Sequence, residues 1–142
     1  MENLKVSTDP EVSISSYHID DTEVVWFKLI IKVGDREWSV AHRYNEFDEL
    51  HSKLRKTHNG QGREFDVKLP PKKFRPNADF LDKRKDELQI YSRELLQFYH
   101  RNIPIKLADF LLFYKYQPNG LVLQLYEFLK KVFNLVLILI LI

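Results

Sequence analysis

The sequence predicts an α+β domain in which a three-stranded antiparallel sheet packs against a helical subdomain. Three strand-like segments come first in the 142-residue chain, and amphipathic helical segments follow them. Strands grouped ahead of helices favour a small sheet with helices packed on it over alternating β–α units. Hydrophobic residues make up 44% of the chain and aromatic residues 13%, which is sufficient for one core.

Period-two patterning near the start of the chain predicts the sheet. In the central segment, alternate apolar residues share one face, namely Val25, Phe27, Leu29, Ile31 and Val33. The three expected strands span residues 12–19, 24–33 and 37–42. Asp20-Asp21 and Gly34-Asp35 are turn-forming pairs between them, so the short connections predict an antiparallel meander. Residues 1–11 are polar and are predicted to form a flexible N-terminus.

The hydrophobic period changes from two to three and four after the strands. A first helix is predicted to run to about Thr57 on the stripe of Tyr44, Phe47, Leu50 and Leu54. A second begins near Ala78, where Asn77 or Asp79 is suited to cap it. Its predicted buried stripe is Leu88, Tyr91, Leu95 and Phe98. After Ile103-Pro104, a third stripe comprises Leu107, Phe110, Leu111 and Tyr114.

The folded domain is predicted to cover residues 12–117, and residues 118–142 form a helical, apolar C-terminal tail. After Lys130-Lys131 the tail has eleven residues, of which only Asn134 is polar. A bilayer span needs roughly 20 apolar residues, so a transmembrane helix is not expected. A truncated or alternatively spliced end remains open as an explanation, and so does a segment that adheres to membranes or aggregates as β-structure.

Composition excludes several classes of function. The chain contains no cysteine, which rules out disulfides, thiol catalysis and thiolate metal sites. The five histidines lack metal-ligand spacing, and no catalytic motif or phosphate-binding glycine loop is present, so neither an enzyme nor a cofactor is expected. A net charge of +2 is too small to favour nucleic acid as a partner. The N-terminus has no apolar core and is not a signal peptide.

Two motifs about twenty-five residues apart combine cations with an aromatic ring. Arg43-Tyr44 comes first, and Leu69-Pro70-Pro71-Lys72-Lys73 follows. Arginine binds phosphate with a bidentate fork, tyrosine offers a flat face to a sugar ring, and the lysines supply further charge. Basic residues cluster around the second motif, at Lys68, Lys72, Lys73, Arg75, Lys83, Arg84 and Lys85. This set predicts binding of a phosphorylated inositol headgroup at an anionic membrane surface.

These motifs, in this order after three strands, resemble the phox-homology (PX) domain of sorting nexins and NADPH-oxidase subunits. The resemblance covers about residues 10–117 and includes the Lys83-Arg84-Lys85 stretch of the second helix. It implies that Arg43 binds the 3-phosphate, Tyr44 packs on the inositol ring and Lys73 holds the 1-phosphate, with Lys72 as a possible substitute. It also implies that Arg84 hydrogen-bonds the 4- and 5-hydroxyls. Phe74 and Arg75 would belong to a loop that dips into the membrane.

The implied function is recognition of phosphatidylinositol 3-phosphate by a cytoplasmic protein that is peripheral on early endosomes. The main alternative is a PX-like protein-interaction module with weak or no lipid binding, in which an outer-face aromatic such as Trp26 contacts protein partners. Single-stranded nucleic acid is a further, disfavoured partner.

Each predicted site residue also has a purely structural interpretation. Arg43 could pair with Glu46 or Asp48, and Tyr44 could be an ordinary core aromatic. The diproline could simply stiffen a loop, and Arg84 could be a solvated helix charge.

Overall fold

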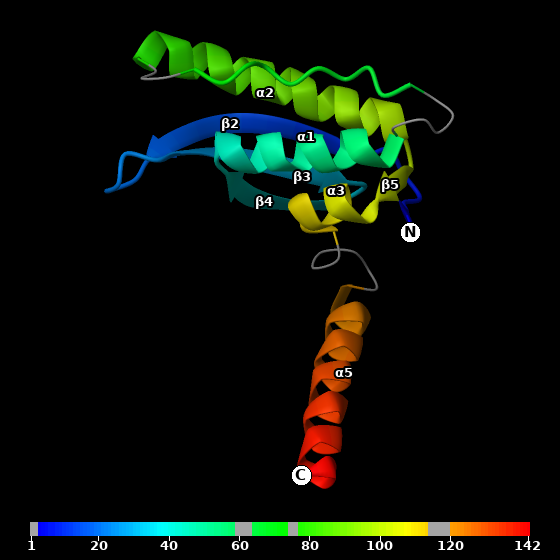
Figure 1. The fold of residues 1–142 in the computed structure, drawn as a ribbon. Coiled ribbons are helices and arrows are strands. Elements are labelled where there is room, and N and C mark those ends of the chain that lie inside the picture. The colour runs from blue at the N-terminus through cyan, green and yellow to red at the C-terminus, as the bar shows by residue number, and fades with distance from the viewer. Residues whose placement is uncertain (1–2, 59–63, 74–76, 114–119) are drawn as a thin grey trace. The chain divides into compact units, whose positions relative to one another are not determined.

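The computed structural model describes residues 3–58, 64–73, 77–113 and 120–142, with side chains in the last segment from residue 125 onward. The chain divides into two compact units, Met1–Leu111 and Leu112–Ile142. The first unit holds both sheets and the helices α1, α2 and α3, and the second holds α5 (Figure 1). The division falls six residues before the predicted domain boundary at residue 117.

The predicted antiparallel meander is present. Its strands are β2 (Glu11–Ile19), β3 (Val25–Val33) and β4 (Arg36–His42), in the order β2-β3-β4. Leu29 in the central strand pairs with Ile14 on one side and Val40 on the other. A shift of register between Ile14 and Ser16 marks a β-bulge in the edge strand. The expected strand positions and the α+β class are therefore confirmed.

Helices cover the apolar face of this sheet. Phe27, Leu29 and Ile31 are buried, whereas Val25 and Val33 at the two ends of β3 are only partly covered. The principal helices are α1 (Tyr44–His58) and α2 (Ala78–Tyr99), and α2 packs along β2 (Figure 1). The predicted stripes of both helices are buried, apart from Tyr44, which is half-buried: Phe47, Leu50 and Leu54 in α1, and Leu88, Tyr91, Leu95 and Phe98 in α2.

Side-chain hydrogen bonds stabilise the N-terminus of α2 and the turn between β2 and β3. Asn77 caps α2, because its side-chain oxygen accepts from the backbone N–H of Phe80 at 2.8 Å. In the β2–β3 turn, the Asp20 carboxylate accepts from Thr22 N at 2.8 Å, Val24 N at 3.0 Å and Trp26 Nε1 at 2.8 Å. These donors hold the pKa of Asp20 well below its usual range. The turn is therefore strongly specified by one carboxylate.

The N-terminal segment, which the sequence suggested to be flexible, contains a short strand. β1 (Asn3–Lys5) pairs antiparallel with β5 (Asn102–Pro104), and Leu4 lies opposite Ile103. Val6 continues the contact by donating its N–H to Arg101 O at 3.0 Å, and only 7% of its surface is exposed. A three-residue strand has too little periodicity to be recognised, and its partner lies about a hundred residues away.

Helices α3 and α5 follow α2 in the chain. α3 (Ile105–Phe110) buries Leu107, and Leu111 follows it into the core, while Tyr114 of the predicted stripe lies outside the described residues. In the second unit, α5 spans Gly120–Leu141. Across the described segments of the chain, no helix has the combined length and apolarity needed to cross a bilayer.

Candidate functional site

The junction between β4 and α1 positions Arg43 and Tyr44. Arg43 O accepts from Glu46 N at 3.0 Å, and Glu46 Oε1 accepts in return from Arg43 N at 3.1 Å. The contact from the Glu46 side chain to the Arg43 N–H is one half of a capping box, and α1 begins at Tyr44. The other Glu46 oxygen lies 3.1 Å from His42 Nδ1. Glu46 thus contacts the backbone of Arg43 and the ring of His42, and no carboxylate in the described part of the chain forms an ion pair with the Arg43 guanidinium.

The predicted headgroup-binding residues line one cavity of about 260 Å³. Arg43 and Tyr44 come from the β4–α1 junction, Lys72 and Lys73 from the loop before α2, and Arg84 from α2 itself. The β2–β3 turn contributes Glu23, Val24 and Val25 to another wall. Residues separated by up to about sixty positions therefore meet at one concave surface. Phe74 and Arg75, predicted to form a membrane-contacting loop, lie outside the described residues.

Tyr44 is both a lining residue and a structural anchor. Its hydroxyl donates to Pro70 O at 2.5 Å, which joins the start of α1 to the diproline loop. Partial burial raises the pKa of this hydroxyl, so the group stays protonated and remains a donor. The ring is half-buried and faces the cavity and Arg84. The core and ligand-stacking interpretations of Tyr44 are therefore compatible.

Arg84 is buried, with 4% of its surface exposed, so the interpretation as a solvated helix charge is wrong. Its guanidinium carbon lies 4.3 Å from the centre of the Tyr44 ring and 4.8 Å from that of Phe80. Nη2 donates to Pro71 O at 2.6 Å. Nε has no hydrogen-bond partner within the described structure. A fixed positive charge is thus held in the cavity wall between two aromatic rings.

Hydrogen bonds to the backbone carbonyls of both prolines hold the diproline loop in place. Pro70 O accepts from Tyr44 and Pro71 O accepts from Arg84, so the next two residues project from a fixed base. Lys72 and Lys73 are exposed, and Lys73 Nζ lies 4.5 Å from the centre of the Phe80 ring. The loop therefore presents two ammonium groups at the rim of the cavity, as its sequence suggested.

The sequence and the fold are similar to those of known proteins. A family model described as PX domain matches residues 32–113, which is more than half of the chain. The chain belongs to the PX domain family. A solved structure titled "X-ray structure of a designed CISK-PX domain" is 28% identical, with a TM-score of 0.62. The match covers 71% of this chain and 97% of that one. The α+β architecture of this protein is the PX fold, and PX domains are generally non-catalytic, phosphoinositide-binding modules that target membranes.

The charge around the cavity of this PX domain suits an anionic ligand. Arg43, Lys72, Lys73 and Arg84 supply positive charge, and Glu23 is the carboxylate among the residues that line it. Sequence reasoning did not single out Glu23 or Phe80. Phe80 could have been found, because it lies four positions before Arg84 on α2 and therefore on the same face of the helix. Glu23 could not have been found in this way, because it lies in a turn with a φ of 66°. Only the tertiary structure brings this turn to the cavity.

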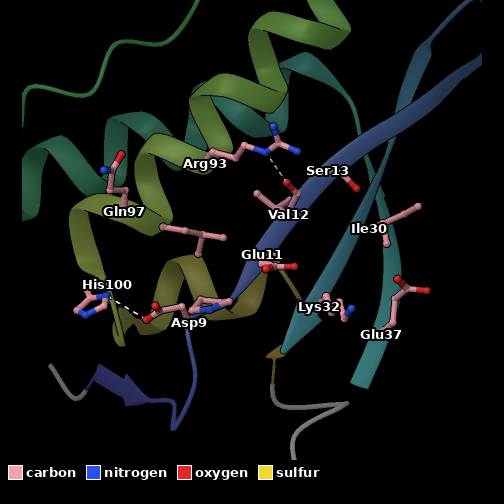
Figure 2. Close-up of a pocket in the computed structure, with 12 residues that line it drawn as sticks. Asp9, Glu11, Val12, Ser13, Ile30, Lys32, Glu37, Arg93, Gln97 and His100 are labelled. Carbon is pink, nitrogen blue, oxygen red and sulfur yellow. Dashed lines mark hydrogen bonds and ion pairs between the residues drawn. The ribbon is translucent and has the colours of Figure 1, made fainter. Parts of the chain in front are cut away.

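A larger hollow of about 790 Å³ lies between the first half of β2 and the last half of α2 (Figure 2). Its charged side chains have both signs, with Asp9, Glu11 and Glu37 near Lys32 and Arg93. Two contacts join residues that line this hollow to one another. Asp9 Oδ1 lies 3.2 Å from His100 Nδ1, and Arg93 Nε donates to Val12 O at 3.0 Å. None of the predicted headgroup residues lines it, and its mixed charge does not select an anion. Chemistry therefore favours the smaller cavity as the PX ligand site.

Proposed function

We propose that this PX domain recognises phosphatidylinositol 3-phosphate, and that it thereby directs its parent protein to early endosomes. The observation that carries the proposal is the convergence of Arg43, Tyr44, Lys72, Lys73 and Arg84 on one cavity. Such a set offers charge-assisted donors to more than one phosphate and an aromatic face to the ring.

Each residue has a proposed role. Arg43 binds the 3-phosphate, because its guanidinium has no carboxylate partner in the described structure and lines the cavity. Tyr44 packs on the inositol ring. Lys73 holds the 1-phosphate at the rim, and Lys72 is close enough in the chain to share that charge. Phe74 and Arg75 are proposed to contact the membrane beside them.

Arg84 is proposed to read the 4- and 5-hydroxyls while also supporting the loop. Its hydrogen bond to Pro71 O leaves the guanidinium with little freedom to turn. A lipid phosphorylated at the 4- or 5-position would have to fit a larger group against this fixed wall. We therefore expect lipids with those phosphates to bind more weakly than the 3-phosphate lipid.

The affinity for a single headgroup is expected to be modest. Each charge-assisted hydrogen bond contributes about 1.5–3 kcal/mol net. Much of that offsets the loss of translational and rotational freedom, so a dissociation constant of micromolar order is expected. Durable membrane residence then depends on a second contact that acts together with the pocket.

Liposome flotation of the full chain tests the site and the specificity together. Vesicles of phosphatidylcholine with one phosphoinositide each are compared, for the unsubstituted protein and for Arg43→Gln. We expect recovery above the phosphatidylcholine background to be greatest with the 3-phosphate lipid, and this increment to vanish in Arg43→Gln without a change in circular dichroism. An unchanged increment in the variant would contradict the site.

The main alternative is a protein-interaction module, and the same experiment separates it. No increment with any phosphoinositide, from a folded protein, would favour that alternative. A soluble headgroup, inositol 1,3-bisphosphate, added to isotopically labelled protein gives an independent measurement, because resonances of the lining residues shift only if the cavity is occupied.

Within the PX family we propose kinship with the N-terminal PX domain of nischarin. The proposal rests on the stretches Trp38–Tyr44 and Leu69–Lys73, which resemble that domain. A consistently higher sequence identity to another PX subgroup over the whole domain would contradict it.

A further inference from the structure

Helix α5 exposes an unusual amount of apolar surface. From residue 125 to the end of the helix, every described side chain is exposed. The exposed fraction is 73% for Leu139, 73% for Ile140 and 83% for Leu141. Contiguous apolar surface of this kind is unfavourable in water and marks a site of interaction.

The apolar surface of α5 surrounds the helix instead of forming a stripe. Successive residues of an α-helix point about 100° apart, so four consecutive apolar residues face every direction. Leu135, Val136, Leu137 and Ile138 are such a run, and each is between 40% and 61% exposed. A partner helix covers one stripe only, and a helix lying flat on a membrane needs a polar face. A surrounding apolar medium covers all sides.

Polarity in α5 changes along the helix axis. Glu127, Lys130 and Lys131 precede residues 132–141, in which Asn134 is the one polar residue. Lys130 Nζ lies 4.7 Å from the centre of the Tyr126 ring and 4.0 Å from Glu127 Oε1. Tyrosine and lysine are the residue types that gather where a membrane helix meets the headgroups.

We propose that residues 132–141 of α5 insert, lysine end outermost, into the acyl-chain layer of a phospholipid membrane. Ten helical residues at about 1.5 Å each extend about 15 Å, which is half of a hydrocarbon core of about 30 Å. Lys130 and Lys131 then lie at the level of the headgroups. This lipid contact involves no phosphoinositide and no residue of the cavity, so it does not depend on the proposed headgroup function.

Depth-dependent fluorescence tests the insertion directly. Because the chain has no cysteine, Ile140→Cys can be labelled singly with an environment-sensitive nitrobenzoxadiazole dye, with Glu127→Cys as the matched position. The full chain is synthesised in the presence or absence of phosphatidylcholine vesicles without phosphoinositide. We expect a blue shift at position 140 only with vesicles, and stronger quenching there by 12-doxyl than by 5-doxyl lipid. Position 127 should show the reverse preference.

A charge placed inside the inserted segment tests it by partitioning. Leu137→Lys should reduce binding to phosphatidylcholine vesicles by about a hundredfold, because a lysine is costly at membrane depth. Glu127→Lys, which changes charge outside the segment, should leave binding nearly unchanged. Arg43→Gln should also leave it unchanged, so failure of the headgroup site and failure of this proposal give different results.

Three outcomes would overturn the proposal. A blue shift at position 140 without vesicles, together with dimers in sedimentation, would assign the surface to a second copy of the chain. Sediment with β-sheet circular dichroism would assign it to aggregation. An unshifted dye in all samples would mean that the helix stays in water.

Discussion

At the scale of single residues, Arg84 shows how one buried side chain joins structure to function. Burying a guanidinium is costly, and here the cost is offset by two aromatic rings and by the carbonyl of Pro71. Its unpaired Nε within the described structure leaves one donor unused. Arg84 therefore links α2, the first residue of α1 and the diproline loop.

Replacing Arg84 should affect folding as well as binding. We expect Arg84→Ala to lower the free energy of unfolding by about 1–3 kcal/mol, because Pro71 O loses its donor and two rings lose their packing partner. Urea unfolding measures this change, and Arg43→Ala is the matched control, expected to lose headgroup binding at nearly unchanged stability. Equal stability of the two variants would show that Arg84 does not support the loop.

His51 should make stability depend on pH near neutrality. Its Nδ1 lies 2.9 Å from the Tyr91 hydroxyl, whose pKa is raised by burial so that it stays protonated. Burial, with a further contribution from Arg55, lowers the pKa of His51 below its ordinary value of 6.5. Below that pH the unfolded chain takes up a proton at His51 that the folded protein resists.

Thermal unfolding between about pH 7.5 and 5 measures the contribution of His51. Stability should fall as the pH drops through and below 6.5, and the fall should be smaller in His51→Gln. His18→Gln is the control, because His18 is exposed on β2. If His51→Gln and His18→Gln show the same slope, His51 does not contribute.

At the scale of elements, the loop that carries Leu69–Lys73 is held in place by hydrogen bonds from two helices. Its prolines restrict the backbone, but the partners that hold their carbonyls belong to α1 and α2. A flexible lysine would lose more conformational entropy on binding than one that projects from a fixed base. The loop is thus pre-organised by tertiary hydrogen bonds.

Removing one loop cation should weaken membrane binding and its salt dependence together. We expect Lys73→Ala to reduce affinity for 3-phosphate vesicles by about tenfold, the equivalent of about 1.4 kcal/mol. The remaining affinity should change less between low and high salt, because fewer charges contribute. Vesicle binding at several ionic strengths measures both effects.

The matched control for Lys73→Ala is Lys68→Ala, since Lys68 is exposed in the same segment and does not line the cavity. A loss of affinity equal to that of Lys73→Ala would indicate diffuse surface charge in place of a specific lysine contact.

At the scale of the whole molecule, the first and last segments of the unit Met1–Leu111 are held by contacts with distant parts of the chain. β1 pairs with β5, and Trp38 Nε1 donates to Leu111 O at 2.8 Å, which links β4 to the end of that unit. These contacts are far apart in sequence, so forming them costs loop-closure entropy and makes folding of the unit cooperative.

Substitutions beside β1 test whether the N-terminal segment packs as the structure shows. Val6→Asp should reduce the free energy of unfolding by about 2 kcal/mol or more, because it puts a carboxylate at a buried apolar position. Lys5→Asp, an adjacent exposed substitution, should have a small effect. Similar, small effects of both in chemical denaturation would indicate a frayed N-terminus.

The sequence by itself determined the class of fold and most of its elements. Period-two and period-three-to-four patterns are local, and they predicted β2, β3 and β4, the starts of α1 and α2, and the buried positions of both helices. Asn77 was one of two candidates for the α2 cap, and the structure selects it. The motifs at Arg43-Tyr44 and Leu69–Lys73 also predicted which residues line one cavity, although their roles there remain proposals.

Tertiary structure alone decided the features that join distant segments. β1 has no periodicity of its own and exists because β5 offers it a backbone partner. From the sequence, a solvated helix charge was one of two interpretations of Arg84, yet the rings of Tyr44 and Phe80 and the carbonyl of Pro71 bury it. Glu23 joins the cavity only through the β2–β3 turn. The reason is the same in each case: burial and hydrogen bonding depend on neighbours in space, which local sequence patterns do not specify.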